Sequence, residues 1–208
     1  PQLVAEVCGV CHQDATDVAG NHTFTGPISE PTYLEWAASP YGNTNSPLYT
    51  TCVDCHMPPS GVNTACDYLP IPRNTNSIRS HTIEGTTPRY LENAVELAMT
   101  TQVDGTNVQV QVTVTNSLTG HHVPTGVTIR NMVLLVEAWR ASDGLPLAHT
   151  GAQMVHPLGG VGNPAQGYYA GLPGKLYTKL IHDVNTNAPV FFTEATGIIF
   201  DNRIPPLA

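Results

Sequence analysis

Positive charge is the property that this sequence has least of. Its 208 residues include 8 Lys and Arg against 16 Asp and Glu, which gives a formal net charge of −8. A protein that binds nucleic acid neutralises phosphates with many cations, so we exclude nucleic acid as a partner. Charged residues of both signs make up only 12% of the chain, about half of their usual share in a soluble domain. We expect such a neutral surface, rich in Thr and Asn, outside the cell.

Long hydrophobic runs are also missing. The longest apolar stretches are residues 132–136 and 197–200, far short of the about 20 residues that a membrane-spanning helix needs. We therefore predict no membrane span. The sequence begins at Pro1 without a methionine or a signal peptide, so we expect a processed chain whose targeting segment has been removed.

What the sequence does contain is one cysteine spacing used twice. Residues 8–12 read CGVCH and residues 52–56 read CVDCH, and C-x-x-C-H is the attachment signature of c-type haem. Two thiols about one helical turn apart reach two vinyl groups on one porphyrin edge, and the next histidine lies under the iron as its proximal ligand. The sequence therefore predicts two covalently attached haems. The residues concerned are Cys8, Cys11, His12, Cys52, Cys55 and His56.

Two other uses of paired cysteines explain less of the pattern. A thioredoxin-like redox pair is expected once, near a βαβ pattern, and neither condition holds. A four-thiolate zinc site commonly has about 15 to 20 residues between its pairs, whereas Cys11 and Cys52 are much farther apart. Neither alternative explains a histidine after both pairs. Covalent haem attachment takes place outside the cytoplasm, so we predict an extracellular or cell-surface protein, with the periplasm as the alternative.

A fifth cysteine, Cys66, belongs to neither motif. A cysteine of this kind is most simply a small buried hydrophobic residue, and a third thioether or an intermolecular disulfide are the alternatives. We therefore expect Cys66 to be buried.

Apolar periodicity divides the chain into two parts. Residues 1–93 show little of it: short helices are expected leading into the first haem motif, from Pro31 to Ala38 and from Thr87 to Glu96. From about residue 95 the period is two, because valines alternate with Gln and Thr over residues 108–114 after an Asp104-Gly105 hairpin signal.

Later apolar segments complete the predicted fold. Residues 132–139, 175–184 and 190–200 are strand candidates, and residues 156–174 form a Gly- and Pro-rich loop. We predict a mainly β protein. An N-terminal dihaem segment of irregular structure and short helices, residues 1–93, precedes an antiparallel β-sandwich, residues 94–208.

A histidine recurs downstream of each haem motif. Residues 21–26 read NHTFTG and residues 80–85 read SHTIEG, so both contain H-T-apolar-x-G. The echo indicates a duplicated haem unit in which each copy supplies a proximal and a distal histidine. Because a carrier haem keeps both axial positions filled, His22 and His81 are candidates for the sixth iron ligands.

Four further segments stand in a characteristic order: TYLEWAASPY at 32–41, TCVDCHMP at 51–58, SHTIEG at 80–85 and TGHHVPTG at 119–126, followed by Arg130. This order resembles multihaem c-type cytochromes of respiratory and extracellular electron transfer, over roughly residues 8 to 140. In that family a C-x-x-C-H-M-P module is followed by a histidine and then by a β-domain that carries G-H-x-x-P-T-G.

The resemblance implies that His81 and His121 are distal haem ligands. Where the family often has a histidine after W-x-x-S, this chain has Tyr41. Together with His22, three histidines compete for two positions, and a surplus histidine could coordinate a haem of a neighbouring chain. The resemblance also implies that subunits can polymerise into an extracellular cytochrome filament with haem stacked on haem between chains.

We therefore predict an electron carrier with two bis-histidine haems c rather than an enzyme, with redox proteins or extracellular electron acceptors as its partners. The alternative is a dihaem peroxidase or a reductase of small oxyanions with one open iron site. Asp54 and Glu84 lie near the motifs, but they are explained equally well as solvated loop charges. A third hypothesis, that the β-sandwich is a docking domain for a partner or glycan, explains fewer of the motifs.

Overall fold

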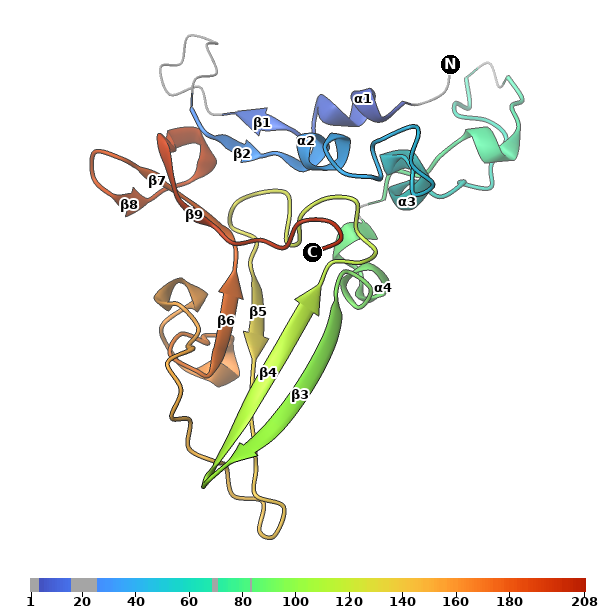
Figure 1. The fold of residues 1–208 in the computed structure, drawn as a ribbon. Helices are drawn as coiled ribbons and strands as arrows, with labels where there is room; N and C mark the ends of the chain where they lie inside the picture. Colours follow the sequence, from blue (N-terminus) through green and yellow to red (C-terminus); the bar gives the residue numbers. More distant parts are fainter. Residues whose placement is uncertain (1–3, 16–25, 69–70, 83) are drawn as a thin grey trace. The chain divides into compact units, whose positions relative to one another are not determined.

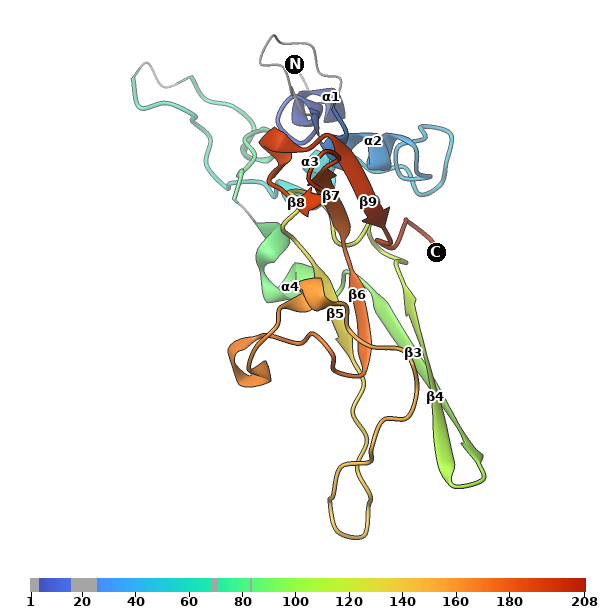
Figure 2. The same cartoon turned by 90° about the vertical axis from the view of Figure 1, so that its left-hand side faces the viewer.

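The computed structural model describes residues 4–15, 26–68, 71–82 and 84–208, which form short helices, small sheets and coil (Figures 1 and 2). The chain divides into two compact units. The first comprises Pro1–Asp14, Pro31–His122 and Pro205–Ala208, and the second comprises Ala15–Glu30 and Val123–Ile204. The predicted domain boundary after residue 93 falls inside the first unit.

Short helices in the first unit carry or flank the two C-x-x-C-H motifs. They are α1 (Ala5–Gly9), α2 (Thr32–Ala37), α3 (Cys52–His56) and α4 (Pro88–Leu91), with 3₁₀ turns η1 (Thr75–Ser77) and η2 (Glu84–Thr86). The helices predicted before the first motif and after Pro31 are confirmed. The helix after Thr87 is shorter than predicted, because it ends at Leu91 and a strand begins at Glu96.

A long hairpin is the largest regular element of the first unit. β3 (Glu96–Asp104) pairs antiparallel with β4 (Asn107–Thr115), and Asp104 lies opposite Asn107 across the turn. Gly105 in this turn has a φ of 59°, a left-handed conformation that glycine adopts without steric cost. The predicted hairpin and the strand over 108–114 are therefore confirmed.

The hairpin has one polar and one mostly apolar face. Leu97, Met99 and Val103 alternate with polar residues along β3, and the register places valines of β4 opposite them. No residue of either strand is buried, and these three side chains are 64%, 67% and 75% exposed. An apolar sheet face is normally covered by another element, so this hairpin is unusual in its exposure.

The first unit also has very little side-chain core. Among its described residues the buried hydrophobic side chains are Ala5, Trp36 and Val53. The second unit has more of them: Val123, Val155, Leu176, Tyr177, Ile181, Ala195 and Ile204. Since burial of apolar surface is the main favourable term in folding, the first unit has little of its own to offset the entropy of ordering its loops.

Several small sheets build the second unit. β5 (Met132–Leu135) pairs antiparallel with β6 (Gly174–Tyr177), and β7 (Lys179–Asp183) lies between β8 (Ala188–Pro189) and β9 (Gly197–Asp201). β1 (Asp14–Ala15) and β2 (Ile28–Glu30) form a further two-stranded sheet. The predicted loop over 156–174 is confirmed, with 3₁₀ turns η3 (Pro157–Gly159) and η4 (Pro164–Gln166).

Strand lengths differ from the sequence-based expectation. The run predicted over 132–139 is a strand only to Leu135, and the segment 190–200 starts with a 3₁₀ turn, η5 (Phe192–Glu194), before β9 begins. A protein of short helices and small antiparallel sheets is thus confirmed, while the two-layer sandwich stays a prediction. Within the described ranges, no helix is long and apolar enough to cross a bilayer.

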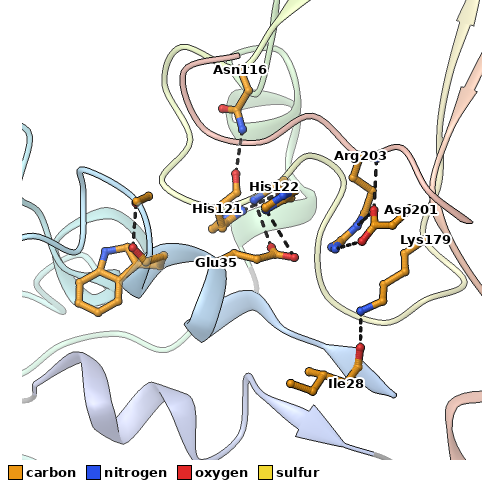
Figure 3. A network of polar contacts seen from close by, with 10 residues as sticks. Ile28, Glu35, Asn116, His121, His122, Lys179, Asp201 and Arg203 are labelled. Carbon is orange, nitrogen blue, oxygen red and sulfur yellow. Dashed lines mark hydrogen bonds and ion pairs between the residues drawn. The ribbon is translucent and has the colours of Figure 1, made fainter. Parts of the chain in front are cut away.

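Buried charges hold the second unit together at one point (Figure 3). The buried ammonium of Lys179 donates to the carbonyl oxygen of Ile28. Arg203 donates two hydrogen bonds, of 2.8 and 2.7 Å, to the carboxylate of Asp201. Burial opposes ionisation of Asp201, but the bonds and charge of Arg203 outweigh it and hold the pKa of this carboxyl below its usual value.

Ile181 tests where the core of the second unit lies. Its side chain is 2% exposed, so we expect Ile181→Ala to lower the free energy of unfolding by about 2–5 kcal/mol. Ile199, 42% exposed in β9 of the same unit, is the matched control, and Ile199→Ala should cost much less. Chemical denaturation followed by circular dichroism measures both, and equal losses would contradict this core.

Candidate functional site

The first C-x-x-C-H motif, residues 8–12, is a single exposed turn at the end of α1. The carbonyl oxygen of Cys8 accepts hydrogen bonds from the N–H groups of Cys11 (3.1 Å) and His12 (2.8 Å), so local backbone bonding gathers the three residues. Cys11 is exposed, and Val7 and Val10 beside it are 53% and 80% exposed. The motif therefore presents thiols and apolar side chains outward, which suits contact with a flat apolar group.

The second motif is the whole of α3, and its N-terminus is capped. The hydroxyl of Thr51 accepts from the backbone N–H of Asp54, while the Asp54 carboxylate accepts from the N–H and hydroxyl of Thr51 at 3.1 and 2.7 Å. This reciprocal capping box satisfies donors that a helix start leaves unpaired. The same bonds lower the pKa of Asp54, so this residue has a structural role rather than being a solvated loop charge.

The two motifs lie against each other within the first unit. Burial raises the pKa of the Cys52 thiol to about 12, and the neighbouring Cys8 thiol adds to the shift. Burial also lowers the pKa of His56, with a further contribution from the positive charge of His12. Helices α1 and α3, which carry Cys8 and Cys52, also contact each other, so the two motifs are neighbours.

Each motif histidine faces a second histidine from another part of the chain. The ring centres of His12 and His81 are 6.3 Å apart with an interplanar angle of 80°. Those of His56 and His121 are 6.1 Å apart with an angle of 20°. The partners come from far along the sequence, which makes two separate pairs, each with one motif histidine.

Polar contacts orient the ring of His121 (Figure 3). Its Nδ1 lies 3.0 Å from the carbonyl oxygen of His122, which assigns the proton to Nδ1 and leaves the Nε2 lone pair available to a metal. Burial is the main cause that lowers the pKa of His121, so the ring is neutral at pH 7. The amide of Asn116, a fully buried residue, donates to the carbonyl oxygen of His121 at 2.8 Å.

An aromatic ring supports the other histidine of this pair. The ring of Tyr90 in α4 stacks on His56 with a centre-to-centre distance of 5.3 Å and an interplanar angle of 18°. The Tyr90 hydroxyl donates to the carbonyl oxygen of Cys55. Tyr90 thus holds the last turn of α3 by its ring and by its hydroxyl.

Helix α2 contacts all three segments that carry His12, His56 and His121. The N–H of Tyr33 donates to the carbonyl oxygen of His12 at 3.2 Å. The indole N–H of Trp36 donates to the carbonyl oxygen of Thr50, just before α3, at 2.9 Å. A carboxylate oxygen of Glu35 accepts from the N–H of His122 at 3.1 Å. One short helix therefore fixes the spacing of the ligand-bearing segments.

The structure brings some of the predicted site residues together but not all of them. The two motifs, His81 and His121 come together as described, whereas His22 lies outside the described residues. Cys66 is exposed, and its thiol donates to the carbonyl oxygen of Tyr68 at 3.3 Å. The expectation of a buried Cys66 is therefore wrong, because the irregular coil around it packs against no core.

Two positions of the cytochrome-like segments have packing roles. Tyr41 donates from its hydroxyl to the carbonyl oxygen of Ser117 at 2.9 Å. Gly120 lies so close to Tyr41 and Trp36 that a Cβ atom there would come within 3.0 Å of the Tyr41 side chain. Sequence reasoning missed Glu35, Tyr90 and Asn116, because no motif spacing distinguishes these residues from ordinary polar or aromatic ones.

Asp54 provides a test of the cap on α3. We expect Asp54→Asn to destabilise the chain by about 0.5–1 kcal/mol at pH 7. Because the folded-state pKa of Asp54 is lowered, its contribution is present above the unfolded pKa and is lost as pH falls through the folded value. The two stabilities should therefore converge below about pH 4.

Denaturant titrations between pH 3 and pH 7 measure this difference. Asp67→Asn is the matched control, since Asp67 is exposed in the same unit and should leave the stability unchanged at every pH. A destabilisation by Asp54→Asn that does not depend on pH would contradict the capping role.

Comparisons with known proteins do not identify a function for this chain. No known protein family, no curated protein and no solved structure matches the chain. Among the residues that the structure describes, no group of three or more His, Cys, Asp or Glu side chains converges on a metal ion. The arrangement is instead two histidine pairs beside two C-x-x-C-H turns.

Proposed function

We propose that this chain carries two covalently attached haems c, each with two histidine ligands, and transfers electrons. The first haem is bound by Cys8 and Cys11 and lies between His12 and His81. The second is bound through the cysteines of α3 and lies between His56 and His121. When bound, the haem iron supplies one-electron redox chemistry, while the chain attaches, orients and insulates it.

The spacing of the histidine pairs is the observation that carries this proposal. A metal–imidazole bond is about 2 Å long, and the ring centre lies about 1.1 Å beyond the nitrogen. Two imidazoles on opposite sides of one iron atom therefore have ring centres about 6.3 Å apart. The observed 6.3 and 6.1 Å match this value in both pairs, and in each pair one ring belongs to a C-x-x-C-H turn.

The surroundings of the pairs also fit a porphyrin. The first unit has only three buried hydrophobic side chains among its described residues, whereas apolar residues around the first motif, such as Val7 and Val10, are exposed. A haem has a large apolar surface that these residues could cover. The cofactor thus provides the core that this unit lacks, and the exposed cysteines Cys11 and Cys55 are accessible for its attachment.

Proximity of the two motifs supports electron exchange between the haems. The Cys8 thiol helps to raise the pKa of Cys52, and the charge of His12 helps to lower the pKa of His56. Groups this close bring two attached porphyrins near to contact. We propose that the pair acts as one relay, with redox proteins or extracellular acceptors at either end.

The same proposal includes export and self-assembly. Covalent haem attachment takes place outside the cytoplasm, which supports an extracellular or cell-surface location. The β3–β4 hairpin supports assembly into a filament, since in the described part of the chain neither of its outer edges pairs with another strand. Long, unprotected strand edges with an apolar face tend to bind other chains.

Carbon monoxide tests the ligand pairs, because it binds a ferrous haem only where an axial position is open. We expect the reduced spectrum of the full-length, haem-loaded protein to be unchanged by carbon monoxide. His81→Ala and His121→Ala should each convert about half of the haem to the carbon monoxide adduct. His149→Ala, at an exposed histidine of the second unit, is the control and should convert none.

Two outcomes would contradict the ligand assignment. If the unmodified protein forms a carbon monoxide adduct, one of its irons has an open axial position. A dihaem enzyme would then be the better interpretation. If carbon monoxide leaves the reduced spectrum of His81→Ala or His121→Ala unchanged, another histidine, such as His22, provides that ligand.

Assembly is tested on the apolar face of the hairpin. If this face binds a second copy, Val103→Lys should weaken self-association about tenfold or more, because a lysine would lose its hydration in the contact. Gln102→Lys, on the opposite face of the same strand, should leave assembly unchanged. Light scattering and electron microscopy of the haem-loaded protein measure this, and a strictly monomeric unmodified protein would contradict the filament.

A further inference from the structure

A buried glutamate, Glu35, lies next to the pair formed by His56 and His121. The side chain of Glu35, in α2, is 6% exposed, and among the described residues it is the only buried Asp or Glu. Burying a carboxylate is costly unless it is paired, so its surroundings indicate what it contributes. The following inference rests on the proposed function, since it concerns the haem between His56 and His121.

Glu35 holds the peptide group that directly follows the His121 side chain. One carboxylate oxygen accepts the N–H of His122 at 3.1 Å, and the other lies 3.6 Å from Nδ1 of the His122 ring. The carbonyl oxygen of the same peptide group accepts from Asn116 at 2.8 Å. A single peptide unit is therefore fixed at its nitrogen by Glu35 and at its oxygen by Asn116, and both of these residues are buried.

The position of Glu35 also places a negative charge near one iron site. The carboxylate oxygens of Glu35 lie 3.1 Å from the backbone nitrogen of His122, the residue after His121, and 3.6 Å from Nδ1 of the His122 ring. In a site of low dielectric constant the effect of such a charge extends further than in water. Reduction of ferric iron removes one positive charge, so a nearby carboxylate stabilises the oxidised state and lowers the midpoint potential.

We propose that Glu35 is a positioning residue that holds His121, and that its charge makes the haem between His56 and His121 the lower-potential haem of the two. The two haems have the same type of ligands, so the difference between them comes from the protein around them. An unequal pair gives the relay a direction, because the electron rests preferentially on the haem of His12 and His81.

Glu35→Gln separates the charge from the packing, since glutamine keeps the size and an oxygen that can accept the His122 N–H. In the full-length, haem-loaded protein we expect one of the two midpoint potentials to rise. The ratio of oxidised to reduced haem at that site should fall about tenfold at a fixed potential, which corresponds to about 59 mV for a one-electron couple. The midpoint potential of the other haem should change by only a small fraction of this amount.

Glu96→Gln is the matched control, because Glu96 is an exposed glutamate of the same unit. It should leave both potentials unchanged. Spectroelectrochemical titration measures all three proteins. If Glu35→Gln leaves both potentials where they were, or raises both equally while both irons remain six-coordinate, the role of Glu35 is disproved.

Assignment of the two potentials in proteins that keep Glu35 gives an independent test, which is needed if Glu35→Gln fails to fold. A methionine in place of an axial histidine raises the potential of that haem. His121→Met should therefore move the lower of the two original potentials, and His81→Met the higher. The opposite assignment would overturn the inference.

Failure of the proposed function would be visible before these titrations. If the purified protein carries no covalently bound haem, or if its reduced spectrum responds to carbon monoxide, the bis-histidine proposal fails. If two six-coordinate haems are present and only the Glu35 and axial-ligand results disagree, the inference about Glu35 fails alone.

Discussion

The contacts of helix α2 are the constraint on which the first unit depends. Six residues long, this helix reaches the segment of His12 through Tyr33, the start of α3 through Trp36 and the His121 segment through Glu35. Each contact is a hydrogen bond to a backbone group. Such bonds fix the position of the chain itself, so loops with little regular structure can present histidines at defined distances.

This arrangement is needed because the two units are stabilised in different ways. The second unit has its own buried residues, centred on Ile181 and its neighbours, and a buried Arg203 that is paired with Asp201. The first unit has few buried side chains, and the entropy cost of ordering its coil must be offset by other terms. The hydrogen bonds made by α2 supply part of this stabilisation. Attached cofactors would supply the apolar contacts that the side chains of this unit do not make.

Electron transfer favours ligands that do not move when the iron changes charge. The two motif histidines lie in or just after short helices whose geometry is set by local hydrogen bonds, including the capping box of α3. Their partners, His81 and His121, lie in loops, where the position of a side chain depends on tertiary contacts. The carbonyl oxygen of His121 accepts a hydrogen bond from Asn116, and the N–H of the next residue, His122, donates to Glu35, while His81 is exposed. The two iron sites of the proposed relay thus differ in rigidity as well as in charge.

The sequence by itself determined the parts of this protein that depend on local spacing. The two C-x-x-C-H turns, the helices after Val4 and Pro31, and the hairpin around Gly105 follow from residues a few positions apart, and the structure has all of them. The histidine echo and the cytochrome-like segments also reduced the histidines outside the two motifs to three candidates, His22, His81 and His121, without choosing between them.

Only the tertiary structure decided which histidine faces which. His81 faces His12 rather than the nearer motif at His56, a choice that sequence order does not predict. No sequence pattern predicted the roles of Glu35, Tyr90 and Asn116, or the exposure of Cys66. Their contacts join residues far apart along the chain, and the energy of such contacts depends on burial and on the geometry of the backbone groups they meet, which no local pattern encodes.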